Sequence, residues 1–184
     1  MSADCSSPSH TRRDALRIGG AAGVALAAAG ALRPGAAART PAAEAGVSVA
    51  KRTVALAAAE RMLAAAQAEA EGLGVAVAVA VVDEAGLLKA FHRMDGVGAV
   101  PVDIAQMKAY TGAIFRAPTH ELAERNLDNP ARLHSLPNVP RGTLLAGGYP
   151  VRDGEAVVGG VGVSGATPEQ DMQIAEAALA ALQA

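Results

Sequence analysis

The spacing of apolar and polar side chains divides the chain beyond residue 48 into helices and strands. From about Val49 to Glu71 apolar residues recur at helical spacing while charged residues lie mostly on the opposite side. This pattern predicts an amphipathic helix that Ser48 caps and Gly72 ends. Val75 to Asp83 is apolar up to its last residue, which predicts a strand covered on both faces.

A hairpin and a second long helix are predicted next. A turn at 83–86, with Gly86 at the positive-φ position, leads into an antiparallel strand from Leu87 to Met94. In this strand His92 shares a face with Leu88 and Ala90. Pro101 opens a helix and Pro118 stops it. The apolar side of this helix is expected to consist of Ile104, Met107, Tyr110, Thr111, Ile114 and Phe115.

The segment after Pro118 predicts a short helix and a long loop. The helix is expected from Thr119, as its N-cap, to about Asn126. Residues 127–141 contain three prolines and no periodic pattern, and they are predicted to be irregular. Because long loops in small domains often carry function, His134 in this loop is a candidate ligand.

Glycine-rich strands and a last helix complete the pattern. Strands are predicted at 144–149, 150–153 and 155–164, with a hairpin turn at Asp153-Gly154. Gly159, Gly160 and Gly162 indicate close approach of another backbone or of a flat ligand. Pro168 opens the final amphipathic helix.

This order of elements predicts an α+β domain. Hairpins joined in sequence form an antiparallel sheet, here of about five strands, with helices packed on it. A chain of 184 residues fits one domain with a modest core. The domain is expected to cover 49–184, after a linker at 39–48 that lacks apolar periodicity.

The first 38 residues are predicted to be an export signal. A basic segment at 11–17 precedes an uncharged run from Ile18 to Leu32, which is too short for a membrane span, and an A-x-A cleavage site ends at Ala38. The paired Arg12-Arg13 resembles a twin-arginine signal, although Ala15 stands where phenylalanine is usual. An ordinary secretory signal is the alternative. Both place the mature chain outside the cytoplasm, secreted or in the cell envelope, without membrane insertion after cleavage.

Composition after cleavage excludes several classes of protein. Cys5 is the only cysteine and lies within the signal, so iron–sulfur clusters and thiolate-ligated haem are excluded. The mature chain keeps 12 basic and 16 acidic residues, a net charge of −4. That charge does not favour binding to nucleic acid or to anionic lipid.

Motifs in order along the chain resemble one known family. They are V-A-V-A-V-V-D-E-A-G-L-L, F-H-R-M-D-G, D-I-A-Q-M-K-A-Y-T, G-G-Y-P-V-R-D-G and V-G-G-V-G-V-S-G-A. Together they resemble the GlcG/HbpS family over essentially the whole mature chain. The resemblance implies a profilin-like fold, a homo-oligomer and haem as cofactor. An exported member resembles the secreted haem-binding branch, which in some bacteria partners a membrane sensor kinase.

The resemblance identifies few iron ligands among the residues of this chain. The PduO-type branch holds haem iron through a histidine in the first helix, and this chain has no histidine between Val49 and Glu71. In the secreted branch a groove threonine is implicated, and Thr111 is the matching candidate, as part of a groove wall rather than as a ligand. Phe115 belongs to the same helix face and is expected to border the cofactor.

Imidazole and tyrosinate are the competent iron donors in this chain. The candidates are Tyr110, Tyr149, His92, His120 and His134. For His92 and Tyr110 the alternative interpretation is a core side chain with a satisfied polar group, and for His134 an exposed loop side chain. Arg141 or Arg152 is a candidate partner for haem propionates.

A separate iron-ion site is a weaker hypothesis. Glu121 and Glu124 lie three residues apart beside His120, so one helix face presents carboxylate and imidazole donors. The alternative is a solvated helix end in which these glutamates pair with Arg125 or Arg116.

Three functions remain open from the sequence. The first is an exported haem-binding protein that acts as a carrier or as a redox or haem sensor accessory. The second is a small-molecule enzyme, isomerase- or lyase-like, although no triad or metal-hydrolase spacing supports it. The third is an oligomeric interaction module with incidental haem binding.

Overall fold

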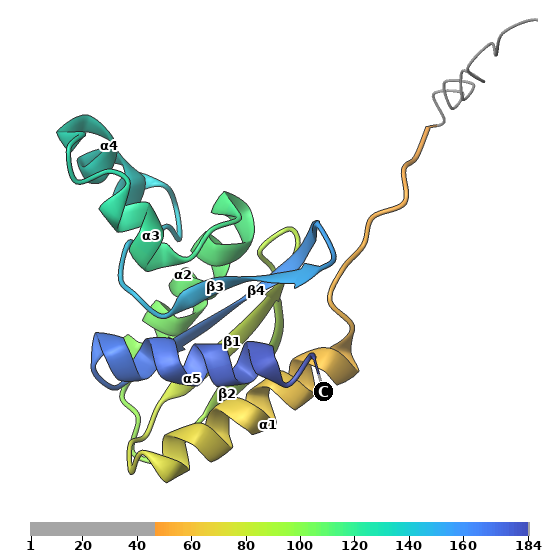
Figure 1. Ribbon diagram of the computed structural model, residues 1–184, viewed down its shortest axis with the longest axis vertical. Helices are drawn as coiled ribbons and strands as arrows, with labels where there is room; N and C mark the ends of the chain where they lie inside the picture. Colours follow the sequence, from red (N-terminus) through yellow and green to blue (C-terminus); the bar gives the residue numbers. More distant parts are fainter. Residues whose placement is uncertain (1–46, 184) are drawn as a thin grey trace, which may run out of the picture. The chain divides into compact units, whose positions relative to one another are not determined.

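A four-stranded antiparallel sheet lies at the centre of residues 47–183, the part of the chain that the computed structural model describes (Figure 1). Its strands are β1 (Ala78–Asp83), β2 (Leu88–Arg93), β3 (Gly148–Asp153) and β4 (Ala156–Ser164). Their order across the sheet is β2-β1-β4-β3, and each neighbouring pair is antiparallel. The predicted α+β class is therefore confirmed, and β2 and β3 form the two edges.

Helices cover both faces of this sheet. The first face packs against α1 (Leu56–Gly72) and α5 (Pro168–Ala180), which lie together in front of the strands in Figure 1. The other face packs against α2 (Ala99–Phe115). Between α2 and β3 the chain makes an excursion through α3 (Thr119–Glu124), α4 (Pro130–Ser135) and the 3-10 helix η1 (Leu136–Asn138), with α4 far from the sheet (Figure 1).

Strand β1 is buried on both sides, as its uninterrupted apolar sequence predicts. Val79 and Val81 belong to the core that α1 and α5 complete. Ala80 and Val82 belong to the second core, under α2. The turn after β1 is also as predicted, because Gly86 has φ +76° and the Asp83 carboxylate accepts backbone N–H groups within the turn.

Helix α2 presents to the sheet a side that differs from the predicted one. The residues that face the sheet are small, apart from one lysine: Ala105, Lys108, Ala109, Gly112 and Ala113. The larger apolar residues Ile104, Met107 and Ile114 lie half-buried or exposed on the outer side. The prediction was wrong because it counted apolar side chains and took no account of how close the helix comes to the strand.

Glycines in β4 set the distance between this strand and helix α2. A Cβ atom on Gly160 would overlap the carbonyl oxygen of Ala109, and one on Gly162 would overlap that of Ala105. The backbones of α2 and β4 are thus nearly in contact, and only small side chains fit between them. Of the two interpretations of these glycines, close backbone approach is the one observed.

Several predicted boundaries also change. Helix α1 begins at Leu56 with Ala55 as its N-cap, so Ser48 lies too far upstream to cap it. In the segment before the helix, the Val54 backbone N–H donates to the Val158 carbonyl, 2.8 Å away. The predicted strands at 144–149 and 150–153 are a loop followed by the single strand β3, which reduces the sheet from five strands to four. Pro150 is tolerated in β3 because that strand is an edge.

The region predicted to be irregular contains two short helices. Pro130 starts α4, and the Asn129 side chain caps it by accepting the Arg132 backbone N–H at 3.2 Å. Thr119 does not cap α3, because it is the first helical residue and its hydroxyl accepts the Gly148 N–H at 3.1 Å.

The predicted export signal and most of the linker lie outside the described residues. Among residues 47–183, none of the helices combines the length and the apolar character needed to cross a bilayer.

Candidate functional site

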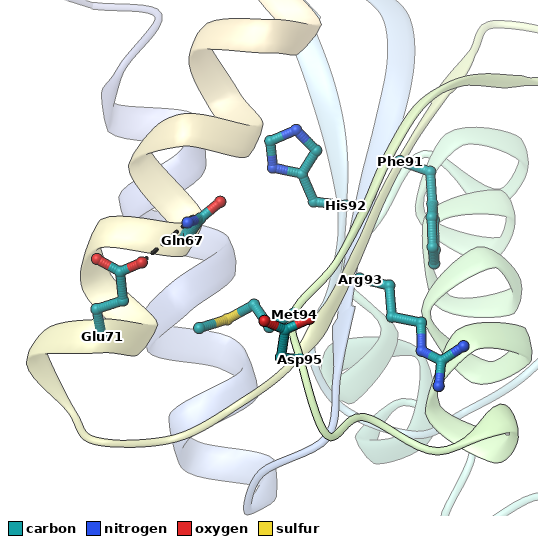
Figure 2. A pocket seen from close by; sticks show the side chains of 7 residues that line it. All are labelled: Gln67, Glu71, Phe91, His92, Arg93, Met94 and Asp95. Atoms are coloured by element: carbon teal, nitrogen blue, oxygen red, sulfur yellow. Dashed lines mark hydrogen bonds between the residues drawn. The ribbon is translucent and has the colours of Figure 1, made fainter.

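A cleft of about 490 Å³ opens at the β2 edge of the sheet, beside the C-terminal half of α1 (Figure 2). Two residues of α1 and five consecutive residues of β2 and its end line it: Gln67, Glu71, Phe91, His92, Arg93, Met94 and Asp95. Because side chains alternate along a strand, the cleft receives side chains from both faces of β2. His92 lies on the α1 side of the strand, and Phe91 and Arg93 lie on the other (Figure 2).

His92 is the imidazole of this cleft. It pairs with Val79 across the sheet, but β2 is an edge strand and the His92 side chain is exposed. No hydrogen bond joins it to the other residues of the cleft (Figure 2). The interpretation of His92 as a core histidine is therefore wrong, and a ring nitrogen is available to a ligand.

The other polar groups of the cleft are mostly engaged with one another. The Gln67 amide donates to Glu71 at 2.9 Å, and the Arg93 Nε donates to the Val97 carbonyl at 2.7 Å. The Met94 sulfur accepts the Val77 backbone N–H at 3.5 Å. With Glu71 and Asp95 against Arg93, the lining carries more negative than positive charge, which suits a cationic centre.

Two candidates from the sequence, Tyr110 and Arg141, come together on the outer side of α2. The Arg141 guanidinium carbon lies 4.6 Å from the centre of the Tyr110 ring, and Arg141 Nη2 donates to the Gly86 carbonyl at 2.7 Å. Arg141 has a left-handed backbone, φ 68°. Arg141 thus connects the loop after η1 to the β1–β2 turn by a hydrogen bond. Its guanidinium also covers one face of the Tyr110 ring.

Thr111 and Phe115 do not form a groove with them. Thr111 is 1% exposed, and its hydroxyl donates to the Met107 carbonyl at 2.9 Å and accepts the Thr143 N–H at 3.0 Å. Thr111 is therefore buried within this chain and presents almost no surface to a cofactor. Phe115 is half-buried at the end of α2.

The candidates on α3 and α4 do not gather around a metal. Glu121 pairs with Arg125, which is the alternative that the sequence left open, and Glu124 is exposed. The His120 Nδ1 is buried without a partner. His134 is exposed on α4, at the opposite end of the molecule from β2 (Figure 1). Within 47–183, no three histidine, cysteine, aspartate or glutamate side chains are placed to hold a metal ion.

Tyr149 is a poor source of tyrosinate. It is buried beside the His120 ring, at a centroid distance of 5.7 Å, and its hydroxyl donates to Glu176 at 2.8 Å. Burial, reinforced by Glu176, raises the pKa of Tyr149 above its ordinary value. The phenol therefore stays protonated at neutral pH.

A buried ion pair was missed by the sequence analysis. Lys108 Nζ lies 2.7 Å from Asp171 Oδ2 and 2.7 Å from the Val163 carbonyl oxygen, with 3% and 5% of the two side chains exposed. One signal was present in the sequence, since Lys108 falls between Ala105 and Ala109 on the small-residue side of α2. Its partner is 63 residues away, and no local pattern identifies it.

The model of the HbpS-like family, described as haem degrading protein HbpS-like, matches residues 54–180. An uncharacterised 15.0 kDa protein of Citrobacter freundii is 40% identical over 129 residues, which cover 69% of this chain and 90% of that protein. Corrinoid adenosyltransferase PduO of the same organism is 35% identical over 104 residues, 55% of this chain, but the match spans only 31% of that longer protein.

Solved structures agree with the sequence relatives. HbpS of Streptomyces reticuli, solved as a double mutant, is 39% identical with a TM-score of 0.69, covering 77% of this chain and 94% of that one. A PduOC–haem complex is 29% identical with a TM-score of 0.64, covering 70% of this chain and 94% of that one.

Proposed function

The chain belongs to the HbpS-like family, and from this premise we propose that it binds haem with His92 as the axial ligand. The family description refers to haem, and one structural relative is a complex with haem. The observation that carries the choice of residue is that His92 lies exposed in the β2-edge cleft, without a hydrogen bond to its neighbours there.

The other candidate donors are less suitable for structural reasons. An Arg141 guanidinium covers one face of Tyr110, and Tyr149 is buried and donates to Glu176. The His120 ring packs beside Tyr149. His134 is exposed on α4, a short helix in which no residue is buried.

The chemistry of the cleft fits haem in part. An imidazole is a competent axial ligand of haem iron, and Met94, on the same side of β2 as His92, offers an apolar surface (Figure 2). Phe91 and Arg93 line the cleft from the other side of the strand. When bound, the cofactor would supply a redox-active iron. One chain lines only one side of this open cleft, so we propose that a second copy completes it.

We propose a homo-oligomer on independent grounds. The outer side of α2 carries three apolar side chains, here called the outer α2 face: Val100 and Ile114, which are exposed, and Met107, which is half-buried. Val100 is 67% and Ile114 39% exposed. Apolar surface of this kind on a helix whose other side is already buried is typical of an interface.

The biological setting is also a proposal. Residues 1–38 have the composition of an export signal, so we propose that the mature protein acts outside the cytoplasm as a haem carrier or as an accessory to a haem or redox sensor. A membrane sensor kinase is the partner that we propose for the second role.

Haemin titration of the purified protein tests the function. We expect saturable growth of a Soret band, and His92→Ala is expected to weaken haemin binding more than about tenfold because the axial nitrogen is lost. His134→Ala is the matched control and should bind like the parent. Equal binding by the parent and the His92 variant would reject His92 as ligand. An absence of saturable change in the parent at micromolar concentration would reject haem binding itself.

A further inference from the structure

A second, smaller pocket lies between α2, the loop before β3 and the start of α5. Its volume is about 190 Å³, which suits a compound of a few carbon atoms. Both members of the buried ion pair line it, together with Ile104, Leu145, Ala146, Ser164, Ala166 and Pro168. A primary amine and a carboxylate therefore border a small, mostly apolar pocket that is separate from the β2-edge cleft.

The surrounding backbone leaves room for the amine. Gly147 has φ +105°, and a Cβ atom there would lie 3.2 Å from Lys108 Nζ and 2.9 Å from the Asp171 Cβ. Lys108 Nζ donates to the Val163 carbonyl and to Asp171 Oδ2, while Asp171 Oδ1 accepts the Ala166 N–H at 3.1 Å. These two acceptors engage two of the three hydrogens of an ammonium group, so one position on the nitrogen remains for a ligand.

We propose that Lys108 forms a Schiff base with a small neutral aldehyde or ketone in this pocket, with Asp171 as the acid–base partner. The carbonyl compound is expected to be uncharged because the Asp171 carboxylate would repel an anion and the pocket walls are largely apolar. The proposal goes beyond haem binding and does not depend on it.

The protonation state of the pair favours this chemistry. Burial lowers the pKa of the Lys108 ammonium, against the opposing effect of Asp171. Burial also raises the pKa of the Asp171 carboxyl, against the opposing effect of Lys108. Both shifts lower the free-energy cost of moving a proton from nitrogen to oxygen, and the neutral amine is the form that attacks a carbonyl carbon.

The reaction balances without a further reagent. The amine nitrogen of Lys108 bonds to the carbonyl carbon, and Asp171 donates its proton to the carbonyl oxygen to give a carbinolamine. Asp171 then takes a proton from nitrogen and returns it to the hydroxyl group, which leaves as water when the C–O bond breaks. The ammonium–carboxylate pair thus becomes an iminium–carboxylate pair, with one water released and no change of oxidation state.

Reductive trapping tests the proposal on the full chain. The sequence has three lysines, and Lys51 and Lys89 are exposed, so they serve as internal controls. The folded protein is incubated with limiting n-butanal and sodium cyanoborohydride, and butylation at each lysine is followed by peptide mass spectrometry. We expect Lys108 to be butylated about tenfold faster than Lys51 or Lys89, because its amine is desolvated beside an acid–base group. Slower butylation at Lys108 than at both exposed lysines would overturn the proposal.

A pocket-filling variant distinguishes reaction of Lys108 inside the pocket from reaction of Lys108 in transiently unfolded protein. Ala146→Leu adds bulk to the pocket wall and leaves both charged residues in place. We expect the variant to lose preferential butylation at Lys108 while the rates at Lys51 and Lys89 stay unchanged. An unchanged rate at Lys108 would show that the aldehyde does not enter through this pocket, and the proposal would then be wrong. Haemin titration of the same variant should match the parent, so that failure of one proposal is distinguishable from failure of the other.

Discussion

At the scale of single residues, the Lys108–Asp171 pair is the most consequential feature of the core. A buried ion pair loses much hydration, and only close geometry and further hydrogen bonds offset that loss. Here the Val163 carbonyl and the Ala166 N–H supply those bonds, and they join α2 to β4 and to the start of α5. The pair thus has a structural role whether or not Lys108 reacts.

Removing one partner of the pair should be far more harmful than removing both. Lys108→Met leaves Asp171 buried and unpaired, and we expect it to lower the free energy of unfolding by about 3–5 kcal/mol. The double variant Lys108→Met with Asp171→Leu should recover most of that loss, because neither charge then remains buried. Urea denaturation measures both effects. A single variant as stable as the parent would show that the pair is not desolvated in solution.

At the scale of elements, the close packing of α2 on β4 decides which side of the helix faces the sheet. Gly160 and Gly162 leave no side chain between strand and helix, so the helix presents Ala105, Ala109 and Ala113. The larger apolar side chains are left on the outer side. One helix therefore contributes to the core with one side and presents an apolar surface with the other.

A methyl group at Gly160 tests this packing. Alanine in a strand interior usually stabilises relative to glycine, but here its Cβ would overlap the Ala109 carbonyl oxygen and lie 2.8 Å from the Ala113 nitrogen. We expect Gly160→Ala to destabilise the fold by about 1–3 kcal/mol. Gly72→Ala is the control, because nothing lies within 4 Å of its added Cβ. If thermal unfolding shows equal stability for the two variants, the close approach of helix and strand is absent.

At the scale of the whole molecule, the two candidate surfaces of one chain are incomplete. The cleft that contains His92 is open at the β2 edge, and the outer α2 face is exposed. Association of copies through the outer α2 face would bury apolar area, at about 25 cal/mol per Å².

A charge on the outer α2 face should interrupt assembly. Ile114→Glu places a carboxylate where burial against a second copy would desolvate it, and we expect a smaller species by gel filtration with light scattering. Leu127→Glu is the matched control, since Leu127 is 64% exposed but lies beyond α3, away from this face. If both variants keep the mass of the parent, the interface lies elsewhere or the protein is a monomer.

Local sequence was sufficient for most of the fold. The continuous apolar run of β1, the Gly86 turn and the Asp153-Gly154 hairpin depend on residues close together in the chain, and all three are found as predicted. The motifs also placed the chain in its family. Short-range geometry sets strands, turns and helices, which is why these features can be predicted from neighbours alone.

Tertiary structure alone decided which side chains can act. His92 is exposed in a cleft because β2 is an edge strand, although the sequence predicts that it shares a face with apolar residues. Contact with glycines of a distant strand turns the alanines of α2 to the sheet and leaves Ile114 exposed. Thr111 is buried, and its hydroxyl accepts the backbone N–H of Thr143. The pairing of Lys108 with Asp171 spans 63 residues. Burial and long-range contacts depend on how the elements pack, and this packing is not encoded in any local pattern of the chain.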